Sequence, residues 1–145
     1  LSGKLIPFLE GRKFRGRKLS TYLGGWLKQA LPLRGRKVVA YHKNWAYFVQ
    51  VFGLEIVDYV EPKPGIPPSP GHVARVIRQM KQQKIRVLLA GNYYDSAKVK
   101  SVAARVGAVP VIVGLAVGGE KRMKDVFSQF DVILGRLVAG FQKAR

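Results

Sequence analysis

Apolar and polar positions along this chain follow two periodicities in turn, one typical of buried strands and one typical of amphipathic helices. Strands are predicted for four short, mostly apolar segments: KVVAYH at 37–42, LEIVDYV at 54–60, IRVLLA at 85–90 and VPVIVG at 109–114. Helical spacing of apolar residues follows each of them, at 44–53, 71–84, 96–107 and 125–142. Because strands that alternate with helices pair in parallel, we predict an α/β lobe with a four-stranded, mainly parallel sheet and helices on both faces.

The first 36 residues do not share this alternation. Residues 18–31 have helical spacing around Gly24 and Gly25, whereas GRKFRGRK at 11–18 mixes cations with glycine. We therefore expect a basic, helical or irregular arm over 1–36, followed by a single lobe over 37–145. The beginning of the chain lacks a sustained apolar stretch and a small-residue cleavage site, so no secretory signal is expected within it.

Charge is the outlying feature of the composition. The chain has 26 Lys and Arg against eight Asp and Glu, a formal net charge of +18. Residues 1–37 hold ten of these cations and one acid, so the arm is far more basic per residue than the lobe. Such a field attracts polyanions, and Arg12, Lys13, Arg15, Arg17 and Lys18 would make the contacts. The alternative is a solvated basic surface without a specific partner.

Other classes of function find little support. The absence of cysteine excludes disulfides, thiolate metal sites and cysteine nucleophiles. The longest apolar run, at 108–119, is about half of what a membrane-spanning helix needs. We find no phosphate-binding glycine motif and no set of side chains that forms a catalytic triad or carboxylate pair, so an enzyme is not expected.

The candidate chemistry gathers where the predicted strands end. His42 ends the first strand, Glu61 follows the second and Asp95 lies shortly after the third. Ligands of parallel α/β sheets bind beyond the carboxyl ends of the strands, so these side chains would lie at one edge. Imidazole and carboxylate groups suit a divalent metal. A strand-end histidine that is hydrogen-bonded to a neighbour is the other interpretation of His42.

Several segments together resemble one family. They are YHKNWAYF at 41–48, FGLEIV at 52–57, EPKPGIPPSP at 61–70 and LAVGG at 115–119. Over roughly 34–142 they look like the carboxyl-terminal lobe of the zinc- and manganese-binding substrate-binding proteins of ABC importers. The resemblance implies two lobes joined by a long helix, of which residues 19–31 would be the end. It also implies a periplasmic or other extracytoplasmic location and delivery of the metal to a permease.

The resemblance makes His42 the metal ligand of this lobe, and the positions of Glu61 and Asp95 after neighbouring strands make them candidate helpers. Many members place an aspartate after the fourth strand, but this chain has Leu115 and Ala116 there. Zinc normally takes three or four protein ligands, so we expect weak binding of Zn or Mn by the isolated lobe. Two chains that meet at this edge would pool two His42 side chains, which predicts a homodimer.

Overall fold

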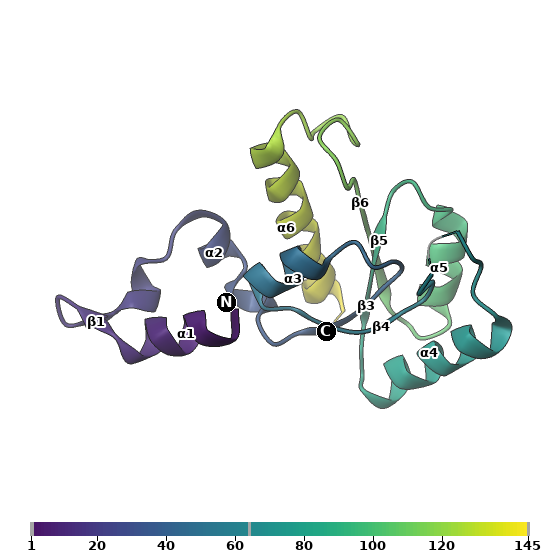
Figure 1. Ribbon diagram of the computed structural model, residues 1–145, viewed down its shortest axis with the longest axis horizontal. Coiled ribbons are helices and arrows are strands. Elements are labelled where there is room, and N and C mark those ends of the chain that lie inside the picture. Colours follow the sequence, from purple (N-terminus) through teal and green to yellow (C-terminus); the bar gives the residue numbers. More distant parts are fainter. Residues whose placement is uncertain (1, 64, 145) are drawn as a thin grey trace.

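A parallel sheet forms the centre of the molecule (Figure 1). The computed structural model describes residues 2–63 and 65–144, with side chains from residue 7 onward. The sheet contains β3 (Lys37–Ala40), β4 (Glu55–Tyr59), β5 (Val87–Gly91) and β6 (Val109–Val113), in the order β4-β3-β5-β6. Each neighbouring pair is parallel, which confirms the fold class predicted from the alternation of strands and helices.

Helices cover both faces of this sheet. One core cluster joins it to α3 (Ala46–Phe52) and α6 (Val126–Lys143), and a second joins it to α4 (Pro70–Gln82) and α5 (Ser96–Ala104). Along β3, Val38 and Ala40 belong to the first cluster, whereas Val39 belongs to the second. Successive strand residues point to opposite faces, so a strand between two helical layers must be apolar throughout.

The four helices begin and end where local sequence directs them. The Ser69 side chain accepts a hydrogen bond from the backbone of α4, and Asp95 does the same for α5. Asp125 and Ser128 form a reciprocal capping box at the start of α6. Helix α3 ends at Gly53, whose φ of 75° is the left-handed conformation that glycine adopts without steric cost. The capped starts of α4, α5 and α6 position the loops at the carboxyl edge of the sheet, whereas Gly53 turns the chain into β4 at the opposite edge.

The basic arm contains several short elements. It comprises α1 (Ser2–Gly11), β1 (Lys13–Phe14), β2 (Arg17–Lys18), the 3₁₀ turns η1 (Leu19–Tyr22) and η2 (Leu31–Leu33), and α2 (Gly25–Gln29). The helical spacing over 18–31 therefore forms a 3₁₀ turn and a short helix, with extended backbone at Gly24 between them. Figure 1 shows the β1–β2 hairpin at the end of the arm away from the sheet.

Trp26 attaches this part of the arm to the lobe. Its ring stacks on Phe130 of α6 at 4.8 Å between centroids, and its indole nitrogen donates to Asp131 at 2.7 Å. Across the described residues, no helix is both long enough and apolar enough to cross a membrane.

Candidate metal centre at the carboxyl edge of the sheet

The order of the strands creates a position for ligands between β3 and β5. Helix α3 leaves β3 on one face of the sheet, and α5 leaves β5 on the other face. The two connections therefore diverge from neighbouring strands, and the crevice between them lies at the carboxyl ends of those strands. Such switch points are where open α/β sheets bind ligands. His42 follows β3 there, and residues 92–95 follow β5.

His42 occupies this crevice as a buried imidazole, with 3% of its surface exposed. Its Nε2 lies 3.0 Å from a carboxylate oxygen of Glu61, but the contact lacks hydrogen-bond geometry. Within the described part of the chain, Nε2 is thus buried without a hydrogen-bond partner. A buried polar nitrogen without a partner is costly, and proteins commonly retain one where a ligand completes its bonding.

Glu61 is held beside His42 by the backbone. Its N–H donates to the Tyr41 carbonyl at 2.8 Å, and the Val60 N–H donates to the Ala40 carbonyl at 3.0 Å. These bonds extend the β3–β4 pairing and bring the two side chains to the same height along the sheet. The Glu61 side chain is 15% exposed. The structure therefore places Glu61 next to His42, at the edge of the sheet where the sequence analysis expected both residues.

Tyr94 forms one wall of the imidazole site. Its ring stacks on His42, with centroids 4.0 Å apart and planes 14° apart. The Tyr94 hydroxyl contacts the Tyr93 hydroxyl, which also accepts a hydrogen bond from Asn44 at 2.5 Å. Burial, reinforced by the Tyr93 contact, raises the pKa of Tyr94 above its usual range. A neutral phenol ring therefore fixes the plane of His42, a role that the sequence did not reveal.

Asp95 is committed to a different task from the one predicted. Its carboxylate accepts from the Ala97 backbone at 2.9 Å as the cap of α5, and it lies 4.0 Å from the Lys98 ammonium. No group of three or more His, Asp or Glu side chains able to hold a metal occurs among the residues that the structure describes. The structure thus places the Glu61 carboxylate in contact with His42 and uses the Asp95 carboxylate as a helix cap.

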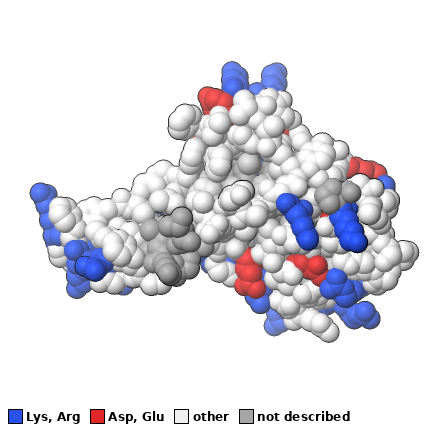
Figure 2. Space-filling model, in the orientation of Figure 1, with Lys and Arg blue, Asp and Glu red and all other residues white. Residues whose placement is uncertain are grey.

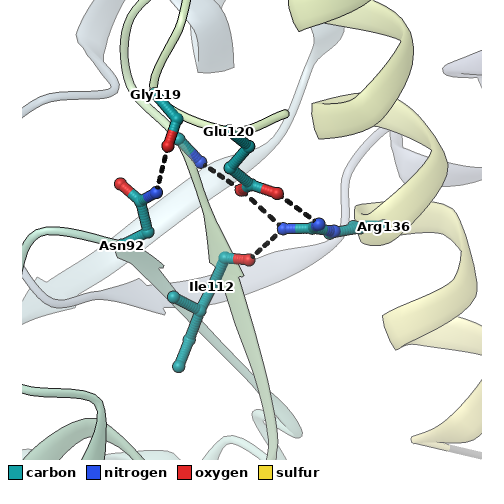
Figure 3. A network of polar contacts seen from close by, with 6 residues as sticks. Asn92, Ile112, Gly119, Glu120 and Arg136 are labelled. Carbon is teal, nitrogen blue, oxygen red and sulfur yellow. Dashed lines mark hydrogen bonds and ion pairs between the residues drawn. The ribbon is translucent and has the colours of Figure 1, made fainter. Parts of the chain in front are cut away.

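A polar network holds the loop after β6 in place (Figure 3). Glu120 accepts hydrogen bonds from the Gly114 backbone at 2.7 Å and from both terminal nitrogens of Arg136, at 2.7 and 2.5 Å. Asn92 donates to the Gly119 carbonyl at 2.7 Å, which ties this loop to the end of β5. Burial alone would raise the Glu120 pKa, but the bonds from Arg136 and Gly114 outweigh it and hold that pKa low.

Leu115 and Ala116 stand where the resemblance led us to look for an aspartate, and their contacts are apolar or made by the backbone. The side chain of Leu115 packs against the first core cluster, and the Ala116 carbonyl accepts from the Gly119 N–H at 3.0 Å. Glu120, the acid of this loop, turns toward Arg136 on α6. Sequence analysis missed this pair because 16 residues separate its members and no motif marks them.

The five predicted polyanion contacts lie on the hairpin of the arm. Their side chains are exposed, and Figure 2 shows Lys and Arg gathered at the tip of the arm. Arg15 lies over the ring of Phe14 at 5.4 Å, Phe14 itself is 54% exposed, and Lys18 contacts Glu10 at 2.8 Å. The hairpin turn has positive φ at Arg15 and Gly16, as the two-residue turn that joins twisted strands requires.

Comparison with known proteins gives a consistent result. The family described as the periplasmic component A of the zinc-uptake complex matches residues 20–131. No match appears among curated proteins.

Among solved structures, one match is the substrate-binding protein FpvC of Pseudomonas aeruginosa in complex with Mn²⁺. It superposes with a TM-score of 0.62 and 21% sequence identity, and the match covers 83% of this chain and 47% of the FpvC chain. A Mn-bound mutant of the periplasmic metal-binding protein of Candidatus Liberibacter asiaticus has a TM-score of 0.62 and 17% identity, covering 79% and 47% of the two chains. The laminin-binding protein of Streptococcus agalactiae has a TM-score of 0.60 and 16% identity, covering 83% and 45%. At these identities the likeness establishes the fold. The chain spans about half the length of the structures it matches.

Proposed function

Because this chain belongs to the family of the periplasmic component A of zinc-uptake complexes, we propose that it is the metal-binding lobe of a substrate-binding protein. It would bind Zn or Mn outside the cytoplasmic membrane and deliver the ion to the permease of an ABC importer. The family is a transport family and not a family of enzymes, so the ion is the cargo and undergoes no reaction.

One observation carries this proposal for the chain itself, namely the buried Nε2 of His42 without a hydrogen bond. An imidazole nitrogen and a carboxylate oxygen 3.0 Å apart can be ligands of one ion, since zinc lies at about 2.1 Å from each. The Tyr94 ring holds the imidazole plane in place. The solved structures support the class of ligand, because FpvC is described with Mn²⁺ and with Ni²⁺.

The number of protein donors determines how strongly the lobe should bind zinc. His42 and Glu61 supply two protein donors, so water would fill the remaining positions, with Asp95 joining only if its carboxylate left the α5 cap. The net charge of +18 also repels a divalent cation. We therefore infer that the isolated lobe binds zinc weakly, with a dissociation constant in the micromolar range or above.

Calorimetric titration with zinc at moderate salt tests the proposal. We expect His42→Ala to abolish the heat of binding, because it removes the imidazole donor. His72→Ala is the matched control, since His72 is the other histidine of the chain and its ring contacts the Tyr59 carbonyl and Arg75. Circular dichroism confirms that both variants fold. Submicromolar binding that survives in His42→Ala would place the site elsewhere and defeat the proposal.

The same titration has a second readout, the mass of the protein in solution. Two lobes that met at their carboxyl edges would bring four donors to one ion, which satisfies tetrahedral zinc. We propose this homodimer as the zinc-loaded form of the isolated lobe. Sedimentation would then show a dimer only when zinc is present and only when His42 is intact.

Binding of a polyanion is the second candidate function, and the exposed hairpin favours it. Five cations and the exposed Phe14 ring project from a short two-stranded ribbon at the tip of the arm. Phosphate groups would pair with the cations without reading a sequence, because the ribbon offers charge and one ring but no set of base-reading side chains. This contact would coexist with metal binding, since the hairpin and the sheet edge are separate.

A further inference from the structure

A cavity of about 730 Å³ lies at the carboxyl edge, beside the candidate metal centre. The proline-rich loop before α4, the ends of β3, β4 and β5, and the start of α5 form its walls. Pockets for small organic ligands commonly measure 300–1,000 Å³, so this space exceeds the need of a single metal ion. Pro67, Pro68, Val73 and Val102 give it apolar walls that would remove water from a hydrocarbon body.

Aromatic rings line the part of the cavity nearest the sheet. Tyr41, Tyr93 and Tyr94 all face it, and the rings of Tyr41 and Tyr94 lie 5.5 Å apart. His42 supports Tyr94 from behind and does not itself line the cavity. The face of an aromatic ring carries negative charge density, so a group of tyrosines favours a cation.

Carboxylates converge on the same end. Glu61 and Asp95 both line the cavity; the Glu61 N–H donates to the Tyr41 carbonyl at 2.8 Å, and Asp95 follows Tyr94 in the chain. Over the described residues, Glu61 forms no ion pair with Lys or Arg, and Lys98, the cation of the lining, is 73% exposed. In a chain of charge +18 this end of the cavity is a local site of negative charge.

We propose that the cavity binds a small organic cation, an amine or quaternary ammonium group on an apolar body about the size of one aromatic ring. The body fills the space between the prolines and valines, and the cationic group lies against the tyrosine rings and the Glu61 carboxylate. The proposal does not depend on metal transport, because the organic cation would itself balance the negative charge of the Glu61 carboxylate.

Three probes with the same body and different charge test this. They are phenethylamine, 2-phenylethanol and 3-phenylpropionate, titrated into the full chain without metal and followed by amide chemical shifts. We expect the amine to bind roughly tenfold more tightly than the alcohol, and the carboxylate to bind least. If the net charge of +18 alone governed binding, the carboxylate would bind most tightly and the amine least. Tighter binding of the anion than of the amine would overturn the proposal.

Substitutions at single positions test whether the preference for the amine arises in the cavity. Glu61→Gln should reduce binding of the amine to that of the alcohol, and Glu55→Gln, an equal change of charge on β4 beside Lys37, should leave it unchanged. Ser101→Phe should obstruct the cavity and weaken all three probes, because Ser101 lines it from α5. If Glu61→Gln fails to fold, Asp95→Asn serves, since its amide oxygen retains the α5 cap while the charge is lost. An amine preference that survives removal of the charge at these positions would contradict the proposal.

Discussion

Glu120 accepts three hydrogen bonds, and its ionisation should therefore make stability depend on pH. Its pKa in the folded protein is lowered from the ordinary value of 4.5. As the pH falls, the Glu120 carboxyl group is protonated at a higher pH in the unfolded chain than in the folded protein. Its contribution to stability is therefore complete above pH 4.5, the ordinary pKa of the unfolded chain. It is lost as the pH falls through the lower, folded-state pKa.

Replacement of Arg136 by Gln tests this dependence. The variant should have a lower free energy of unfolding than the wild type at neutral pH. The difference between the two proteins should shrink below pH 4.5, as Glu120 becomes protonated in both. Urea denaturation across pH 3 to 7 measures it. A difference that stays constant over this range would mean that the guanidinium contributes through packing alone.

Single residues of the site differ in how well the sequence reveals them. His42 and Glu61 could be predicted together because each ends a strand, and parallel strands present their ends at one edge. Asp95 follows a third strand end, but its carboxylate is used by the backbone of α5, and local capping cannot be distinguished from ligation in a sequence. The stacking of Tyr94 on His42 depends on side-chain rotamers, which no spacing specifies.

At the scale of elements, α6 carries two glycines in different surroundings. A Cβ atom at Gly140 would lie 2.5 Å from a methyl group of Val111 on β6, whereas at Gly135 the nearest atom is 4.0 Å away, in the side chain of Gln29. Gly140 thus permits close approach of helix and sheet, and Gly135 has no such role. The two positions form a matched pair within one helix.

Alanine at each position should change stability in opposite directions. Gly135→Ala should raise the free energy of unfolding by about 1 kcal/mol, because alanine loses less backbone entropy in a helix. Gly140→Ala gains the same entropic stabilisation, but its added methyl group is forced against Val111, which costs about 1–3 kcal/mol. We therefore expect the free energy of unfolding to fall by up to about 2 kcal/mol. Urea denaturation measures both. Equal stabilisation by the two substitutions would show that the sheet can yield to the added methyl group.

The elements of the lobe could be predicted closely, and those of the arm less so. Each helix of 37–145 combines apolar residues at helical spacing with a side-chain cap or a glycine at one end, and the strands are short apolar segments between the helices. Over 18–31 the same helical spacing was present, but Gly25 adopts a φ of 50° and Gly24 is extended. Periodicity reports which side chains share a face and does not show whether the backbone continues between them.

At the scale of the whole molecule, the arm concentrates charge away from the sheet. If the hairpin is the polyanion contact, binding of a DNA duplex should weaken steeply with salt. Each phosphate contact contributes about 0.9 to the slope of log K against log salt. Replacement of Arg12, Lys13, Arg15, Arg17 and Lys18 by Gln should therefore reduce that slope by roughly 4, measured by fluorescence anisotropy.

A variant of equal charge provides the control. Arg78, Lys81, Lys100, Lys121 and Lys124 are exposed on the lobe, and their replacement by Gln removes the same five charges. The slope should fall less in this variant. Equal loss in both would mean that the net charge, and not the arm, attracts the duplex.

The outer side of β6 is one of the two edges of the sheet, where a strand of another copy could pair. Val109 and Val113 bond inward to β5, so Pro110, Ile112 and Gly114 face outward. Pro110 has no N–H, the Ile112 carbonyl accepts from Arg136 at 2.7 Å, and the Gly114 N–H donates to Glu120. A bare apolar edge strand is a template for β-aggregation, onto which another chain adds its own strand. Because Arg136 and Glu120 occupy two of these outward backbone groups, we expect their ion pair to disfavour the addition of another strand at the β6 edge of the sheet.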